Sequence, residues 1–145
     1  MSDTDSTSQL LDMHGSLDRI LKSENHVGDA FYPSFMARFP EIREYFQGIN
    51  LHRLTLLLPM ALSVIYQHHA HHYPSTRKYL EYVGSHHSLR GIPPAAYPKF
   101  REALLAALEQ MLKDDWHPGL AKEWSAAIDE AVETMLSAYG TRVTI

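Results

Sequence analysis

The sequence predicts an all-α protein of about six to seven helices, and three observations support this fold class. Apolar residues recur at three- and four-residue intervals along most of the chain. No segment alternates apolar and polar residues for long enough to predict a strand. The chain has 145 residues, of which 45% are hydrophobic and 21% are charged, as in a single globular domain. We therefore expect a flexible, Ser- and Asp-rich N-terminus over residues 1–8 and one domain over residues 9–145.

Three helices are predicted in the first half of the chain. The first has an amphipathic pattern over residues 10–21 and ends at the polar residues 23–25. The second ends near Pro40, and its apolar face consists of Val27, Phe31, Phe35 and Phe39. A short connector containing Phe46 follows, and a strongly apolar helix then runs over about residues 51–67. These segments predict a helix with an aromatic face, a short connector and then a long apolar helix.

Three further helices are predicted in the second half. One begins near Ser75 or Thr76 and is stopped by the Gly-Ile-Pro-Pro sequence at residues 91–94. Pro94 suits the first turn of the next helix, whose buried face would be Tyr97, Phe100, Leu104, Leu108 and Met111. After a loop at residues 114–118, the last helix would end at Gly140, and its apolar face would be Leu120, Trp124, Ile128, Met135 and Tyr139.

The composition excludes several kinds of chemistry. The chain has no cysteine, which rules out disulfides, thiolate metal sites and cysteine nucleophiles. Its net charge of -4 comes without a basic tract, so we expect no nucleic-acid or anionic-membrane partner. The longest apolar stretch, Leu54–Tyr66, is shorter than the roughly 20 residues of a membrane span. The N-terminus lacks the basic start of a secretory signal, so we expect a cytoplasmic protein.

Four features in chain order describe an apolar slot between an imidazole and a phenol. Tyr32 lies on an apolar helix, and Phe46 follows that helix in the connector. The helix over residues 51–67 carries only one Lys, Arg, Asp or Glu. His87 ends one helix, and Tyr97, ten residues later, opens the next. A planar apolar macrocycle that holds iron needs one axial nitrogen, packed walls and one hydrogen-bond donor on the opposite side. The pattern therefore predicts a haem site.

With these motifs, the chain resembles the globin family from about Leu10 to Tyr139, in particular the single-domain bacterial globins and the globin domain of flavohaemoglobins. FYPSFMARFPEIREYF is similar to their second helix and the corner after it. HHSLRGIPPAAYPKFREALLAAL is similar to their proximal histidine, the following corner and the Tyr-led helix. Trp124, in AKEWSAAIDEAVETML, is similar to the tryptophan of their last helix. The resemblance implies a globin fold that sandwiches haem b between its helices.

The resemblance also implies a role for individual residues. His87 would be the iron ligand, and Tyr97 would support it on the proximal side. Tyr32 would donate a hydrogen bond from its hydroxyl to bound O2. The apolar contacts to the haem would come from Phe46, Leu54, Leu58, Val83, Ile92 and Phe100.

The proximal histidine has a neighbouring competitor. His86 and His87 lie on two adjacent helical faces, so either could point into the site. The face shared by Leu80, Val83 and His87 is the more apolar, and the ten-residue gap to Tyr97 matches the bacterial globins. We therefore favour His87 as the ligand. No residue clearly matches the last-helix glutamate that contacts the proximal assembly in flavohaemoglobins.

The distal helix has two possible registers. An ungapped alignment places Leu54 where the family usually has Gln or His, with Leu58 one turn beyond. A shifted register would place His52 there, with Leu56 beyond it. We favour Leu54 because residues 54, 58, 61, 62 and 65 form one apolar face. Tyr32 is then the expected distal hydrogen-bond donor.

The predicted function is reversible binding of O2, and of NO and CO, by an oxygen carrier, a storage protein or a sensor domain with a signalling partner. One alternative is an NO dioxygenase that takes electrons from a separate reductase, because the chain has no flavin or nicotinamide fingerprint. An alternative of another class is a non-haem protein that binds a transition metal through the cluster His68–His72.

Overall fold

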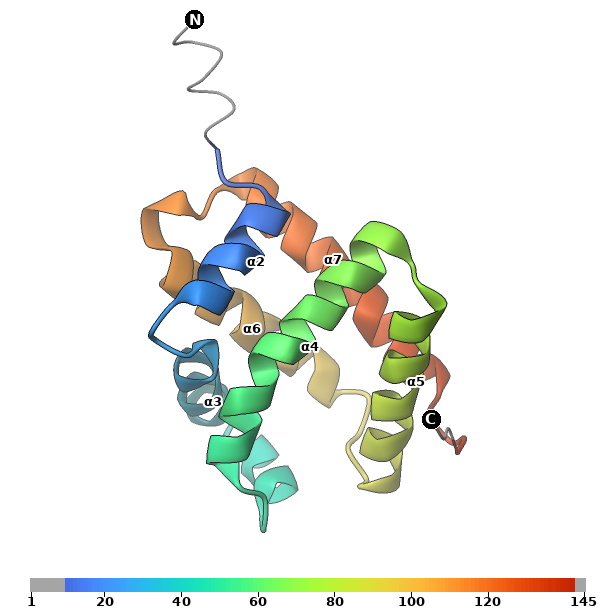
Figure 1. Ribbon diagram of the computed structural model, residues 1–145. Coiled ribbons are helices and arrows are strands. Elements are labelled where there is room, and N and C mark those ends of the chain that lie inside the picture. The colour runs from blue at the N-terminus through green and yellow to red at the C-terminus, as the bar shows by residue number, and fades with distance from the viewer. Residues whose placement is uncertain (1–9, 143–145) are drawn as a thin grey trace, which may run out of the picture.

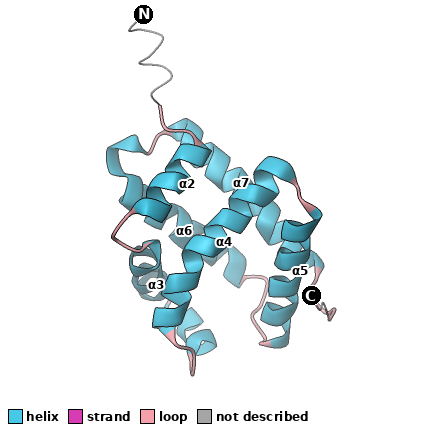
Figure 2. Cartoon of the chain, in the orientation of Figure 1, coloured by secondary structure: helices cyan, strands magenta, loops and turns pink. Residues whose placement is uncertain are grey.

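The structure is a computed structural model that describes residues 10–142, and within this range it contains helices and no strand (Figure 2). Its elements in chain order are α2 (Met13–Lys22), α3 (Val27–Arg38), the 3-10 helix η1 (Pro40–Phe46), α4 (Leu51–His71), α5 (Pro74–Leu89), α6 (Ala96–Leu112), the 3-10 helix η2 (Lys113–Asp115) and α7 (Pro118–Ser137). The predicted all-α fold class is confirmed. The predicted flexible segment, residues 1–8, lies outside the described residues.

The helices cross one another around a shared apolar core. In Figure 1, α4 crosses in front of α6 and α7, α2 and α3 lie along one side of α4, and α5 packs beside α7. Trp124 is fully buried at the centre of α7, and its indole Nε1 donates a hydrogen bond of 2.8 Å to Ser16 on α2. The other fully buried large side chains include Phe31, Leu62, Leu104, Leu108, Leu112 and Ile128. The core therefore draws on every long helix, and α5 contributes Leu80 to it.

Two glycines permit the closest helix crossings. A Cβ atom added to Gly28 on α3 would lie 2.7 Å from the backbone of Thr55 on α4. A Cβ atom added to Gly84 on α5 would lie only 2.0 Å from the carbonyl oxygen of Met135 on α7. Real atoms do not approach so closely, so α5 reaches its place against α7 only because residue 84 has no side chain. Gly84 thus sets the position of the helix that carries His87.

The structure corrects several predicted helix ends. The apolar helix continues to His71 rather than stopping near Gln67, and it ends where His72 takes a left-handed conformation with φ 54°. The last helix ends at Ser137, a turn before Gly140, because the chain bends there to bring Tyr139 toward α6. In the last turn of α6, Leu112 is fully buried and the predicted Met111 is only half-buried.

Among the described residues, no single helix has both the length and the apolarity to span a membrane. The pair η1 and α4 passes that test only when taken together, and the two are bent by 100°.

Candidate functional site

The end of α5 and the start of α6 bring His87 and Tyr97 together. His87 lies in the last turn of α5, and Gly91 allows the chain to reverse with φ 80°. The turn is held by backbone hydrogen bonds from Gly91 to Ser88 and from Ile92 to His87, each 3.0 Å long. Tyr97 is the second residue of α6 and is buried. As a result, Nδ1 of His87 lies 2.7 Å from the hydroxyl oxygen of Tyr97.

A third side chain, Tyr139, extends this contact. Its hydroxyl oxygen lies 3.2 Å from that of Tyr97, and its proton is donated to the carbonyl oxygen of Ile92 at 2.9 Å. Burial raises the pKa of both phenols, most strongly that of Tyr97. His87, Tyr97, Tyr139 and the Ile92 carbonyl therefore form one line of neutral hydrogen-bonding groups, which we call the proximal chain.

The imidazole of His87 is neutral in this setting. Burial lowers its pKa to about 4, with smaller contributions from the positive charges of Arg90 and His86. Within residues 10–142 the hydrogen bond of its ring is made at Nδ1, and none is made at its second nitrogen, Nε2. A neutral imidazole that is held at Nδ1 and unpaired at Nε2 is a suitable donor for a metal ion.

His86, the competing residue, lies in a different environment. It is exposed, and its ring packs edge-on against Tyr82, with the ring centroids 4.4 Å apart. Its imidazole takes no part in the proximal chain. The structure thus separates the two histidines by burial and by hydrogen bonding.

Tyr32 belongs to a second group of residues, formed by α3, η1 and α6. Its ring packs edge-to-face against Phe46 at 6.0 Å, and Phe100 contacts the same group through Phe31 at 5.6 Å. Burial raises the pKa of Tyr32 to about 12, so the phenol stays protonated at neutral pH. Its hydroxyl forms no hydrogen bond to any other described residue. We call this group the aromatic cluster.

The apolar site residues are mostly half-buried. Leu58 on α4 is buried and Leu54, one turn before it, is half-buried, whereas His52 is exposed. Val83 and Ile92 are half-buried too, as are Phe46 and Phe100 of the aromatic cluster. No hydrogen bond or ring contact between described residues joins the aromatic cluster to the proximal chain. Of the nine predicted residues, His87 and Tyr97 thus belong to the proximal chain, and Tyr32, Phe46 and Phe100 belong to the aromatic cluster. The other four are the apolar side chains of Leu54, Leu58, Val83 and Ile92.

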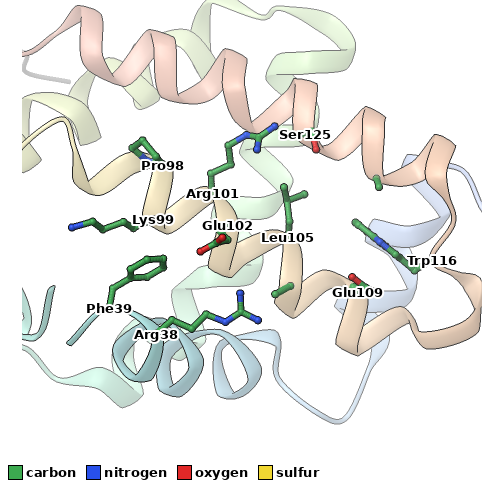
Figure 3. Close-up of a pocket in the computed structure, with 12 residues that line it drawn as sticks. Arg38, Phe39, Pro98, Lys99, Arg101, Glu102, Leu105, Glu109, Trp116 and Ser125 are labelled. Carbon is green, nitrogen blue, oxygen red and sulfur yellow. The ribbon is translucent and has the colours of Figure 1, made fainter. Parts of the chain in front are cut away.

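Two surface hollows lie elsewhere. An open groove of about 700 Å³ lies between α3, α6 and α7. Arg38, Lys99 and Arg101 lie around Leu105, and Trp116 lies at one end of the groove beside Glu109 (Figure 3). A second hollow of about 770 Å³ lies between the turn after α2 and the end of α6. None of the nine predicted site residues lines either of them.

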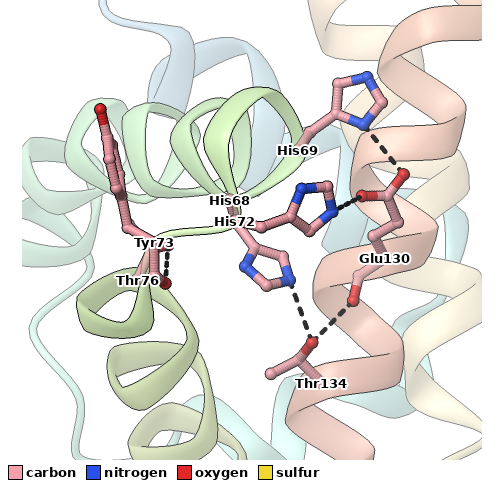
Figure 4. A network of polar contacts seen from close by, with 7 residues as sticks. All are labelled: His68, His69, His72, Tyr73, Thr76, Glu130 and Thr134. Carbon is pink, nitrogen blue, oxygen red and sulfur yellow. Dashed lines mark hydrogen bonds and ion pairs between the residues drawn. The ribbon is translucent and has the colours of Figure 1, made fainter.

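The cluster His68–His72 is tied to α7 (Figure 4). Two of its histidines contact the carboxylate of Glu130: Nδ1 of His69 lies 2.9 Å from one oxygen, and Nε2 of His72 lies 3.5 Å from the other. Nε2 of the buried His68 lies 3.3 Å from the hydroxyl of Thr134. Within residues 10–142, no group of three His, Asp or Glu side chains is arranged to hold a metal ion. The non-haem alternative therefore has no geometric basis in the described chain.

Tyr139 is the site residue that the sequence analysis missed. The resemblance directs attention to a carboxylate in the last helix, where no residue clearly matches. In the structure the Glu130 carboxylate lies beside His69 and His72, and the hydroxyl of Tyr97 contacts Tyr139 instead. Tyr139 instead reads as one more apolar residue of the last helical face. The sequence could have pointed to Tyr139 only as a phenol near the end of the last helix, since a phenol can replace a carboxylate as a hydrogen-bond acceptor.

The comparisons with known proteins agree with the fold. The chain is similar to the crystal structure of protein PA3967 from Pseudomonas aeruginosa PAO1, described as structurally highly homologous to a human haemoglobin. The TM-score is 0.70 and the identity 23%, over 87% of this chain and 99% of that one, which shows a shared fold. No curated protein matches the chain. The family model for globins matches residues 29–135, and the chain therefore belongs to the globin family.

Proposed function

We propose that the chain binds haem b through Nε2 of His87 and uses it to bind O2 reversibly, with NO and CO as further ligands. The observation that carries this proposal is the state of His87. Its imidazole is neutral, its Nδ1 is held by Tyr97, and its Nε2 has no partner among the described residues. In metal-bound histidines, one ring nitrogen likewise binds the metal while the other donates a hydrogen bond to a neighbouring group.

The remaining residues fit the same group. Haem needs apolar walls, and Phe46, Leu54, Leu58, Val83, Ile92 and Phe100 supply them from η1, α4, α5, α6 and the turn before α6. All of them except the buried Leu58 are partly exposed, as expected of side chains that would pack against an apolar ring. Haem also needs few charges near its centre, and the proximal chain and Tyr32 are all neutral at pH 7.

When bound, haem would supply a ferrous iron able to take up O2, CO or NO. The chain's own residues do the rest. His87 holds the iron, the apolar side chains exclude water, and the Tyr32 hydroxyl donates a hydrogen bond to the bound gas. Leu54 offers no polar group, so Tyr32 is the distal donor in this proposal.

The proximal chain favours gas binding over the NO dioxygenase alternative. A carboxylate behind the proximal histidine draws the Nδ1 proton strongly and makes the imidazole a better electron donor. Here the groups behind His87 are two phenols with raised pKa values. We therefore propose an oxygen carrier, store or sensor domain, and an NO dioxygenase with a separate reductase as the second candidate.

Titration of the purified full chain with haem tests the proposal. We expect one haem per chain and a Soret band of histidine-bound haem. His87→Ala should lower haem affinity by at least about 10- to 100-fold, the range caused by losing even an outer partner of a metal ligand. His86→Ala, the matched control, should bind as the wild type does. If His86→Ala loses affinity and His87→Ala does not, the ligand is assigned to the wrong residue.

A further inference from the structure

We propose that Tyr139 is a positioning residue that acts through Tyr97 to fix the tautomer of His87, so that Nδ1 carries the proton and Nε2 is free to bind the iron. The inference rests on the proposed haem-binding function for its purpose, but its physical basis is the proximal chain alone. A residue in the turn after α7 would thus prepare the ligand on α5.

The argument begins at the backbone end of the proximal chain. The carbonyl oxygen of Ile92 lies 2.9 Å from the Tyr139 hydroxyl, and a carbonyl can only accept a hydrogen bond. Tyr139 has a single hydroxyl proton, so this contact uses it. The oxygen of Tyr139 is then left as an acceptor for its other neighbour.

That neighbour is Tyr97, whose hydroxyl oxygen lies 3.2 Å away. Because the proton of Tyr139 is already committed to Ile92, Tyr97 must donate across this contact. The oxygen of Tyr97 then accepts in its contact with Nδ1 of His87, 2.7 Å away. Nδ1 must therefore carry the proton. In this arrangement each of the three donors is used once and every contact is satisfied.

The opposite direction of donation, from Tyr97 to Nδ1 of His87, is less favourable. If Tyr97 donated to an unprotonated Nδ1, either its contact with Tyr139 or the Ile92 carbonyl would lose its donor. An unmade hydrogen bond at a buried group costs more than an exposed one, because water does not replace it. The groups that would lose a partner, the Ile92 carbonyl and the Tyr139 hydroxyl, belong to half-buried residues beside the buried Tyr97, so water would replace the lost bond only in part.

The position of Tyr139 is held from the side of α5. The backbone N–H of Gly140 donates to the hydroxyl of Ser88 at 3.1 Å, and the hydroxyl of Ser85 donates to the carbonyl of Thr141 at 2.7 Å. Both serines lie on the helix that carries His87. The end of α7 and the end of α5 therefore form one rigid unit, and the phenol of Tyr139 has a fixed place beside Tyr97.

Nitrogen NMR of the full chain without added haem tests the inference, because it reports which nitrogen of His87 is protonated at pH 7.5. We expect the Nδ1–H tautomer to dominate in the wild type. In Tyr139→Phe, the ratio of the Nδ1–H to the Nε2–H tautomer should fall by about 2- to 13-fold, the equivalent of one net hydrogen bond. The control is Tyr82→Phe, which removes a hydroxyl from α5, the helix that carries His87. Tyr82 packs against His86 rather than His87, so the tautomer ratio of His87 should stay unchanged.

The haem-loaded ferrous protein gives a second readout. Without Tyr139, the oxygen of Tyr97 becomes a weaker acceptor, because hydrogen bonds in a chain strengthen one another. The iron–histidine stretching band should therefore move to lower frequency in Tyr139→Phe and stay in place in Tyr82→Phe.

The outcomes separate this inference from the proposed function. An unchanged tautomer ratio or an unchanged band in Tyr139→Phe, or an equal change in Tyr82→Phe, would overturn the role of Tyr139 even if haem binds. If the tautomers respond as expected and haem does not bind, the role of Tyr139 stands and the proposed function is wrong.

Discussion

His87 and Tyr32 show how burial decides what a polar side chain can do. Each is surrounded by apolar groups, each is neutral at pH 7, and each presents one polar atom without a partner among the described residues. The sequence could predict both because their helix positions and the ten-residue gap from His87 to Tyr97 are local features. Tyr139 could not be found in this way, since its contact with Tyr97 spans 42 residues of sequence.

Tyr32→Phe should speed O2 dissociation from the haem-loaded protein by about 5- to 150-fold. Bound O2 carries partial negative charge, and a hydrogen bond to a charged group contributes roughly 1–3 kcal/mol in a dry pocket. CO carries much less charge on its outer atom, so its dissociation should change far less. Stopped-flow measurement of both gases on both proteins provides the check. Equal changes for O2 and CO would mean that Tyr32 acts by its bulk alone.

His68 should make the stability of the fold depend on pH. Its side chain is buried, and desolvation lowers its pKa below 6.5, with further lowering by His72 and Arg77 against an opposing effect of Glu130. At pH values between the pKa of His68 in the folded chain and that in the unfolded chain, the unfolded chain binds more protons than the folded one. The free energy of unfolding is therefore highest above about pH 6.5 and falls as the pH drops below it. The slope for one proton is at most about 1.4 kcal/mol per pH unit.

The substitution His68→Gln removes the titrating imidazole but keeps a side chain that can form a hydrogen bond with Thr134. Urea unfolding at pH 8 and pH 5.5 should therefore show a smaller loss of stability on acidification in His68→Gln than in the wild type. A loss of the same size in both proteins would show that other groups cause the pH dependence.

At the scale of helices, apolar periodicity predicts which segments are helical but not where each one ends. The end of α4 depends on the left-handed conformation of His72, and the end of α7 depends on contacts of residues 139–141 with α5 and α6. Both are set by tertiary structure. Pro33 and Pro59 end neither helix: α3 and α4 continue through them, as the predicted helices do, although each proline removes a backbone donor.

Gly84→Ala should destabilise the fold by about 1–3 kcal/mol or more, because an added methyl group would overlap the backbone of Met135. The helix α5 would have to move away from α7 and carry His87 with it, so haem affinity should fall as well. Urea unfolding and haem titration measure the two effects.

Gly119→Ala is the matched control for Gly84→Ala. A Cβ atom at this exposed position of α7 would lie 3.3 Å from the ring of His117, a contact that a side chain can relax. It should change stability by less than about 1 kcal/mol, since alanine also favours the helix. A cost at Gly84 no larger than that at Gly119 would show that the α5–α7 crossing tolerates a side chain.

For the whole molecule, the sequence predicts the fold class, and the structure and the globin family match confirm it. The aromatic cluster and the proximal chain are predicted separately, as local patterns on neighbouring helices. How the two groups lie in space depends on helix crossings such as Gly28 against Thr55, which no local pattern reveals. The role of the nine site residues in holding haem stays a prediction.

The most direct test of the proposed haem ligand is rescue of a cavity variant with a small molecule. In ferrous haem-loaded His87→Gly, the iron–histidine stretching band should disappear, and added imidazole should restore an iron–imidazole band, because imidazole replaces the missing side chain. His86→Gly should keep the band of the wild type. A band that persists unchanged in His87→Gly, or that disappears in His86→Gly, would contradict the assignment of Nε2 of His87 as the iron ligand.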